Sequence, residues 1–266
     1  MFINKNVKAE LLKRKSNDNL EKNIPVSGIY KLNLQKIDFD MLVINSDDTS
    51  ISRRFWNNNY SDYSLDTWCN WCKEDGIYID VGAHTGLYTI AALVSNNKNR
   101  LVSIEPFSLN YHRIITNLRL NNFNNINVKL LNVAVSDNNK QVKFDVKTNW
   151  SYLSKGGRIN NQGYEIQAIK LDSLKFTDDD VHIKGIKIDV EGEDLKVILG
   201  AEQIIKKHMP KIIVECRSNN ILEIITFMSK LGYKNIYDKS GNRFGSKKLA
   251  EIGNKVKAKD IFFEKI

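Results

Sequence analysis

Residues 77–86 read IYIDVGAHTG, an apolar run of strand character that ends at Gly82 and turns into a helical segment over residues 85–95. The same alternation of a short apolar run with a longer helical segment recurs along the chain. The later strand–helix pairs are 101–106 with 108–122, 185–190 with 193–208, and 211–216 with 219–232. Near-continuous apolar strands alternating with helices predict an α/β fold, a mostly parallel sheet with helices on both faces.

Local signals mark the ends and breaks of these elements. Ser108 is a candidate N-cap for its helix, Gly200 interrupts the segment 193–208, and Gly232 ends the helix that begins at residue 219. A third strand is predicted over residues 126–136, and short alternating runs follow over residues 142–174.

The two ends of the chain add further elements. Residues 28–45 alternate apolar and polar side chains in two runs, which predicts a β-hairpin, and residues 61–73 form a helix that Ser61 or Asp62 caps. Residues 233–237 and 260–265 read as the final strands. We therefore expect an N-terminal extension, residues 1–60, with a tail and a hairpin, and one domain over residues 61–266.

Composition restricts the class of protein. The chain has 266 residues, of which 42% are hydrophobic, so it can bury a core and is not wholly disordered. No stretch approaches 18 consecutive apolar residues, so we expect no membrane-spanning helix, and residues 1–23 lack the apolar centre of a secretory signal. Three cysteines do not make a disulfide framework, which indicates a reduced, cytoplasmic location.

The net charge of +9 is unevenly distributed. Residues 1–23 carry +3 and residues 229–266 carry +6, so residues 24–228 are neutral overall. One interpretation is a pair of solvated, lysine-rich ends. The other is a basic surface that attracts a polyanion such as nucleic acid.

The first strand and its neighbour carry the strongest site signal. Gly82 and Gly86 allow a tight turn that a ligand can approach, and Glu105 follows the second strand at the spacing where a carboxylate meets a ribose. His84 stands where a dinucleotide-binding turn would have its middle glycine, and Asp80 would repel a pyrophosphate but can pair with an amino group. These features favour S-adenosylmethionine as the cofactor.

The fourth and fifth strands bring a family resemblance. Residues 186–201, IKIDVEGEDLKVILGA, and 210–215, PKIIVE, resemble the FkbM family of S-adenosylmethionine-dependent methyltransferases. IDVGAHTG, IEP and NVAVSD, with Asn117 and Asn122, look like the same family. The resemblance covers about residues 61–216.

The resemblance implies a Rossmann-like class I methyltransferase with seven strands, the last antiparallel. It implies methyl transfer to a hydroxyl oxygen, for example of a sugar in a glycan or glycolipid precursor or of a natural product. By position, Glu105 would hold the ribose and Phe107 would lie against the adenine. The other cofactor-binding candidates are Asp80, Gly82, His84, Thr85 and Gly86 at the methionine end, and Asn132 and Val133 at the adenine edge.

A base is needed because a hydroxyl is a poor nucleophile until its proton leaves. Asp189 and Glu191, at the carboxyl end of the fourth strand, are the leading candidates, with Lys187 and Glu215 beside them. Glu193 is expected to cap the following helix instead. No Asp/His cluster demands a metal, and none is expected.

Two other functions remain open at this point. Lys187 and the basic ends suit an RNA ribose 2′-O-methyltransferase, and a catalytically silent S-adenosylmethionine-binding module is the third reading. A loop-like segment over residues 147–165, with Trp150, Tyr152, Arg158 and Tyr164, is either a cover that stacks on a sugar or a plain exposed hairpin.

Overall fold

The structure is a computed structural model that describes residues 27–35, 37–56, 62–123, 127–146, 157–176, 182–216, 220–244 and 259–265. The predicted tail and Trp150 and Tyr152 lie outside these ranges. Within them no helix is both long and apolar enough to cross a bilayer.

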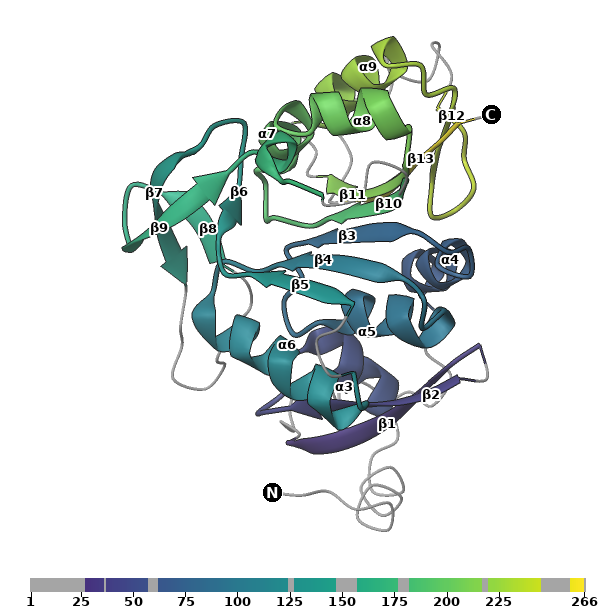
Figure 1. Cartoon of the computed structure of the whole chain (residues 1–266), viewed down its shortest axis with the longest axis vertical. Coiled ribbons are helices and arrows are strands. Elements are labelled where there is room, and N and C mark those ends of the chain that lie inside the picture. Colours follow the sequence, from purple (N-terminus) through teal and green to yellow (C-terminus); the bar gives the residue numbers. More distant parts are fainter. Residues whose placement is uncertain are drawn as a thin grey trace, which may run out of the picture.

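A seven-stranded sheet forms the centre of the molecule (Figure 1). Its spatial order is β12 (Asn235–Asp238), β13 (Lys259–Glu264), β11 (Lys211–Cys216), β10 (Ile183–Ile188), β3 (Ile77–Val81), β4 (Arg100–Ile104) and β5 (Val128–Leu131). Neighbouring strands are parallel from β11 to β5, and β13 runs antiparallel to both of its neighbours. The prediction of a mostly parallel seven-stranded sheet with an antiparallel last strand is confirmed.

Helices cover both faces of this sheet, as predicted. On one face lie α4 (Tyr63–Trp71), α5 (Leu87–Ser95) and α6 (Ser108–Leu120), and on the other α7 (Asp194–Leu199), α8 (Glu202–His208) and α9 (Ile221–Lys230) (Figure 1). Successive side chains of a strand point to opposite faces. Tyr78 therefore packs in the core with α4 and α5, while Ile79 packs in the core with α7 and α8.

The predicted third strand divides in two. Residues 128–131 form β5 of the large sheet, whereas Ala134–Val135 form β6 of a separate four-stranded sheet, order β6-β9-β7-β8. The other members are β7 (Lys140–Val146), β8 (Gly157–Asn160) and β9 (Tyr164–Ile169), and the turn Leu171–Ser173 follows. The Asn132 amide donates to the Glu105 and Pro106 carbonyls at 2.8 and 3.0 Å. These bonds hold the chain at the point where it leaves the large sheet.

Two helix signals have different outcomes. Gly200 separates α7 from α8, as predicted, and a Cβ there would lie 2.1 Å from the Ser136 carbonyl oxygen, so only glycine fits. The prediction of Ser108 as N-cap is wrong, because Phe107 holds that position and makes no side-chain capping bond. Asp62 does cap α4, accepting from the backbone N–H groups of Ser64 and Leu65.

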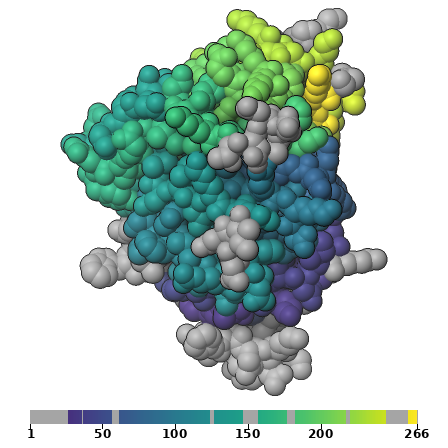
Figure 2. All heavy atoms as spheres, viewed as in Figure 1, coloured from purple at the N-terminus to yellow at the C-terminus, as the bar shows by residue number. Residues whose placement is uncertain are grey.

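The N-terminal segment consists of β1 (Gly28–Leu34) and β2 (Ile37–Val43), which form the predicted hairpin, and α3 (Thr49–Trp56), which was not predicted. Met41 and Ile51 are fully buried in the core that contains α5 and α6. Asn117 of α6 accepts from the Leu42 N–H at 2.8 Å. The hairpin and α3 thus pack directly on the large domain, and Figure 2 shows their purple surface continuous with the teal surface beside it.

Candidate functional site

A cavity of about 880 Å³ opens at the carboxyl ends of β3, β4, β10 and β11. Its volume lies in the range of roughly 300–1,000 Å³ that is usual for small-molecule sites. The N-terminal segment, the large sheet and the four-stranded sheet all contribute to its walls. This is the edge of an open α/β sheet where ligands bind.

The turn after β3 is built around Gly82. Its φ is +74°, and a Cβ on this residue would lie 1.9 Å from the Asp189 carbonyl oxygen. The Gly82 and Ala83 N–H groups donate to the Ile104 carbonyl at 2.9 and 3.0 Å, and Asp189 N–H donates to Val81 at 3.0 Å. The loops after β3, β4 and β10 are therefore held together, with no room for a side chain at position 82.

Replacing Gly82 by Ala is expected to destabilise the fold by about 3 kcal/mol, because an L-residue at this φ is strained and its methyl group overlaps backbone. Chemical denaturation measures the change. Gly241→Ala is the matched control, since φ is +75° there and nothing lies within 4 Å of the added Cβ. Gly241→Ala should lower the free energy of unfolding only by the cost of the left-handed conformation, about 1–2 kcal/mol. Equal losses in the two variants would show that the contact with the loop after β10 is unimportant.

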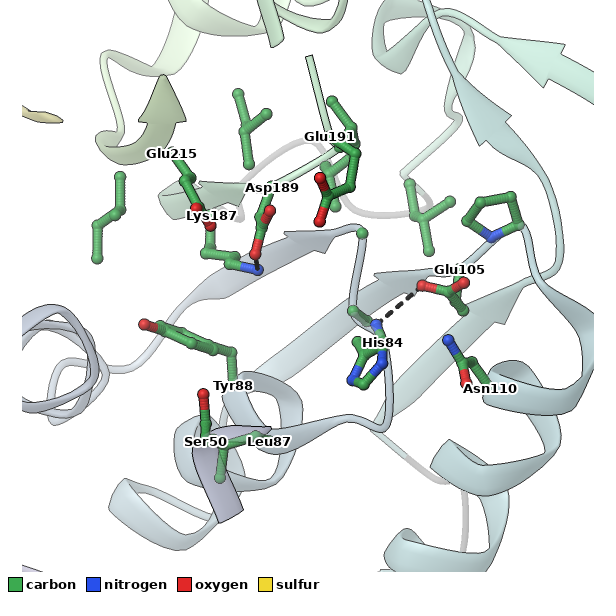
Figure 3. A pocket seen from close by; sticks show the side chains of 18 of the residues that line it. Ser50, His84, Leu87, Tyr88, Glu105, Asn110, Lys187, Asp189, Glu191 and Glu215 are labelled. Carbon is green, nitrogen blue, oxygen red and sulfur yellow. Dashed lines mark hydrogen bonds and ion pairs between the residues drawn. The ribbon is translucent and has the colours of Figure 1, made fainter. Parts of the chain in front are cut away.

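Glu105 faces this turn from the end of β4. Its carboxylate accepts from the His84 N–H at 2.8 Å and from the Phe107 N–H at 2.9 Å, and Asn110 also bonds to it (Figure 3). Burial raises its pKa, and the charge of His84 opposes that shift. Backbone donors thus fix a carboxylate at the cavity wall.

The remaining cofactor-binding candidates divide into two groups. His84 and Val133 line the cavity, with Ala134, Val135, Phe144 and Ile159 forming an apolar wall beside Val133. Asp80, Thr85, Gly86, Phe107 and Asn132 are not among the residues that line it. The Thr85 hydroxyl donates to Asp48 at 2.5 Å, and Gly86 begins α5 against Ile114.

Asp80 lies beneath the turn and is fully buried. Its carboxylate accepts from the Thr89 hydroxyl at 2.7 Å. Burial raises the pKa of Asp80, opposed by the charge of Lys187, which is its register partner on β10. The structure thus gives Asp80 contacts within the protein core and does not place it among the residues that line the cavity.

Three of the four catalytic candidates form one cluster. Lys187 Nζ lies 3.1 Å from Asp189 Oδ2 and 4.8 Å from the centre of the Tyr88 ring (Figure 3). Burial works against charge on both Lys187 and Asp189, but their attraction outweighs it, so the pKa of Lys187 is raised and that of Asp189 lowered. The pair is therefore ionised at neutral pH.

Glu215, at the end of β11, completes the cluster. Its side chain hydrogen-bonds to Asp189, and the charge of Asp189, together with burial, raises the pKa of Glu215 to about 8. Two close carboxyl groups share protons in this way because both charges together are unfavourable. At neutral pH Glu215 holds the shared proton and Asp189 carries the charge.

Glu191 and Glu193 also line the cavity. Glu191 has φ +55°, the left-handed region that is unusual for a residue other than glycine. Glu193 holds the N-cap position of α7 but makes no side-chain capping bond, and its carboxylate pairs with Lys196 at 2.7 Å. Glu193 thus occupies the predicted N-cap position of α7, without a side-chain capping bond. Among the residues with described positions, no three His, Cys, Asp or Glu side chains group to hold a metal.

Sequence reasoning missed the contribution of the N-terminal segment. Asp47, Asp48, Ser50 and Arg53 all line the cavity. Asp48 Oδ2 lies 3.4 Å from His84 Nδ1. Burial opposes protonation of His84, but the hydrogen bond and charge of Asp48, with smaller effects of other acids, raise the pKa of His84 to about 9. Asp48 followed by Thr49 and Ser50 is a helix-start signal that could have revealed α3.

Comparison with known proteins places the chain in a family. The model of the methyltransferase FkbM domain matches residues 80–234, more than half of the sequence. The chain belongs to the FkbM methyltransferase family. The resemblance drawn from the sequence is confirmed. A search of curated proteins finds no match.

Solved structures of methyltransferases resemble this FkbM family member. The methyltransferase FkbM from Methylobacillus flagellatus is 20% identical with a TM-score of 0.49, covering 71% of this chain and 43% of that one. Precorrin-6y C5,15-methyltransferase from Geobacter metallireducens is 13% identical with a TM-score of 0.42, covering 76% and 87%. The M. jannaschii TYW2 complex with AdoMet is 11% identical with a TM-score of 0.40, covering 91% and 89%. The chain spans less than half the length of the M. flagellatus protein.

The FkbM domain match does not include every residue of the cavity. Glu105, Lys187, Asp189 and Glu215 fall within residues 80–234, whereas Asp48 precedes that range. In this family member the N-terminal segment therefore adds to a site whose Glu105, Lys187, Asp189 and Glu215 lie within the family match. Other lining residues also fall outside that match: Asp62, Tyr63, Lys239, Ser240 and Asp260.

Proposed function

We propose that the protein transfers a methyl group from S-adenosylmethionine to a hydroxyl oxygen. One observation carries the proposal: a single cavity has a backbone-oriented carboxylate, Glu105, on one wall and the Lys187–Asp189–Glu215 cluster on another. The first suits a ribose and the second suits proton transfer.

The residues present fit the cofactor. Glu105 would accept from the ribose hydroxyls, and the apolar wall of Val133, Ala134 and Phe144 would face the adenine. The described lining has nine carboxylate residues against four Lys and Arg, an excess that suits a cationic sulfonium and opposes a pyrophosphate. When bound, S-adenosylmethionine supplies a methyl group already activated on sulfur.

Asp189 is the proposed base. With S-adenosylmethionine bound, the Asp189 carboxylate would accept the proton of the acceptor hydroxyl. The methyl carbon would pass from sulfur to that oxygen, so that the carbon–sulfur bond breaks and S-adenosylhomocysteine leaves. Lys187 and the protonated Glu215 hold that carboxylate in place through an ion pair and a hydrogen bond. Orientation supplies roughly 7–11 kcal/mol in such reactions, and a positioned base adds about 10²–10⁴-fold.

A neutral acceptor, such as a sugar in a glycan or glycolipid precursor, suits this cavity better than RNA does. The carboxylate excess around Asp189 would repel phosphates. The RNA ribose alternative has one feature in its favour, the Lys187–Asp189 pair beside Glu215. The intact cluster speaks against a catalytically silent module.

Transfer of a labelled methyl group from S-adenosylmethionine to sugars, lipid extracts and RNA separates these functions. We expect label in carbohydrate-containing material that resists ribonuclease and base treatment, since an ether bond forms. Label only in ribonuclease-sensitive material would overturn the choice of acceptor. Cofactor binding without transfer to any of these pools would favour the silent module.

A further inference from the structure

We propose that Asp48 is a positioning residue that pairs with a protonated His84 and so couples the N-terminal segment to cofactor binding. The inference rests on the proposed function, because it concerns the turn that would hold the cofactor. Asp48 lies outside the family domain match, which begins at residue 80, whereas His84 lies within it.

The Asp48 carboxylate joins three groups that are distant in sequence or belong to different elements. Oδ1 accepts from the Ile51 N–H at 3.0 Å at the start of α3. Oδ2 accepts from the Thr85 hydroxyl at 2.5 Å and lies 3.4 Å from His84 Nδ1. Asp48 is 5% exposed, so these contacts form away from solvent, where charge interactions are strong. One buried carboxylate therefore ties α3 to two successive residues of the turn.

His84 connects this pair to the cavity. Its φ is +54°, a conformation that the surroundings must hold because histidine does not favour it. In this conformation its backbone N–H donates to Glu105 at 2.8 Å, while its side chain, 31% exposed, lines the cavity (Figure 3). The Asp48 contacts thus fix the same residue that orients the proposed ribose-binding carboxylate.

The charges around His84 favour its protonated form. Asp47 and Asp48 face it from the segment before α3, Glu105 from the end of β4 and Asp189 from the end of β10. Asp47 also pairs with Arg113 of α6 at 2.9 Å, which leaves Asp48 as the principal partner. The pKa of His84, about 9, keeps the ion pair intact at neutral pH and breaks it as pH rises above 9.

The test uses the whole chain and S-adenosylhomocysteine, with affinity measured by calorimetry at pH 7 and pH 10. For wild type we expect binding about tenfold weaker at pH 10. For Asp48→Asn we expect binding about tenfold weaker than wild type at pH 7. Raising the pH to 10 should then weaken the binding of this variant much less than it weakens that of wild type. The amino group of the ligand titrates equally in both proteins, so only the difference between them counts.

Three controls keep the result specific. Asn is a good N-cap, so Asp48→Asn retains α3, and thermal unfolding confirms that the variant is folded. Asp172→Asn replaces a carboxylate that accepts from the Gln203 and Ile204 N–H groups at the start of α8 and is not part of the cavity lining, so it is expected to keep affinity within about threefold and the wild-type pH dependence. His84→Asn, whose side chain tolerates positive φ and can hydrogen-bond to Asp48, is expected to restore much of the pH 7 affinity relative to His84→Ala.

An NMR titration of the His84 ring measures the pKa of His84 independently of ligand binding. We expect the pKa of His84 to fall from about 9 toward about 6.5 in Asp48→Asn. Wild-type affinity in Asp48→Asn, or an unchanged His84 pKa, would overturn the proposal. If wild type binds no S-adenosylhomocysteine while the pKa of His84 still depends on Asp48, the proposed function fails and the ion pair stands.

Discussion

The Asp189→Asn variant is expected to transfer methyl groups about 10²–10⁴ times more slowly than wild type, because it loses the base that accepts the hydroxyl proton. Affinity for S-adenosylhomocysteine should stay within about threefold, since Glu105 and the turn at Gly82 are unchanged. Single-turnover transfer to the acceptor and calorimetry measure the two quantities. Full activity in this variant would remove Asp189 as the base.

Glu215→Gln distinguishes Asp189 from its neighbour. Glutamine resembles the protonated Glu215, which the charge of Asp189 maintains up to a pH of about 8. The variant should therefore keep most of its activity at pH 7. In wild type, turnover should fall as pH rises through 8, because ionised Glu215 no longer donates the hydrogen bond that holds Asp189 in place. In Glu215→Gln the amide keeps a donor, so that fall should be absent. A large loss at pH 7 in Glu215→Gln would instead identify Glu215 as the base.

The second large effect is expected at Glu105. Replacing it by Ala should weaken binding of S-adenosylmethionine at least about 100-fold, because hydrogen bonds to a charged partner contribute roughly 1.5–3 kcal/mol each. Calorimetric titration with the cofactor and with S-adenosylhomocysteine measures the loss.

Glu193→Gln is the matched control for charge at Glu105. Its carboxylate lines the same cavity but pairs with Lys196 at the start of α7. This variant should bind the cofactor within about threefold of wild type. Equal losses in both variants would indicate a general effect of cavity charge, and unchanged binding in Glu105→Ala would remove the ribose assignment.

Local patterns in the sequence were sufficient to predict the large sheet. Strands such as Ile77–Val81 are buried on both faces and therefore read as continuous apolar runs, and Gly82 and Gly200 mark positions where backbone passes too close for a side chain. The division of residues 126–136 between two sheets was not predictable in this way. It depends on Asn132 bonding to carbonyl groups 26 and 27 residues earlier.

The candidate site likewise contains some residues whose positions local sequence patterns predict and others whose contacts join distant parts of the chain. Glu105, Lys187, Asp189 and Glu215 follow strands, and parallel strands bring their carboxyl ends together, so their proximity could be anticipated. Side chains alternate along a strand, so Asp80 points to the same face of β3 as Tyr78 and to the face opposite Ile79. On that face lies α5, whose Thr89 donates to the Asp80 carboxylate.

The pair of Asp48 and His84 joins residues 36 positions apart, and no local periodicity records such a contact. The net charge of +9 was also a poor guide to the site. The described cavity lining is rich in carboxylates, so the basic ends of the chain do not indicate the ligand of this cavity.

A crystal structure of the chain with S-adenosylhomocysteine is the sharpest test of the proposed cofactor site. We predict that the ribose hydroxyls bond to Glu105 and that the sulfur faces the open space beside Asp189, with the adenine against Val133. A ligand bound elsewhere, or bound in this cavity with its ribose away from Glu105, would contradict the proposed site.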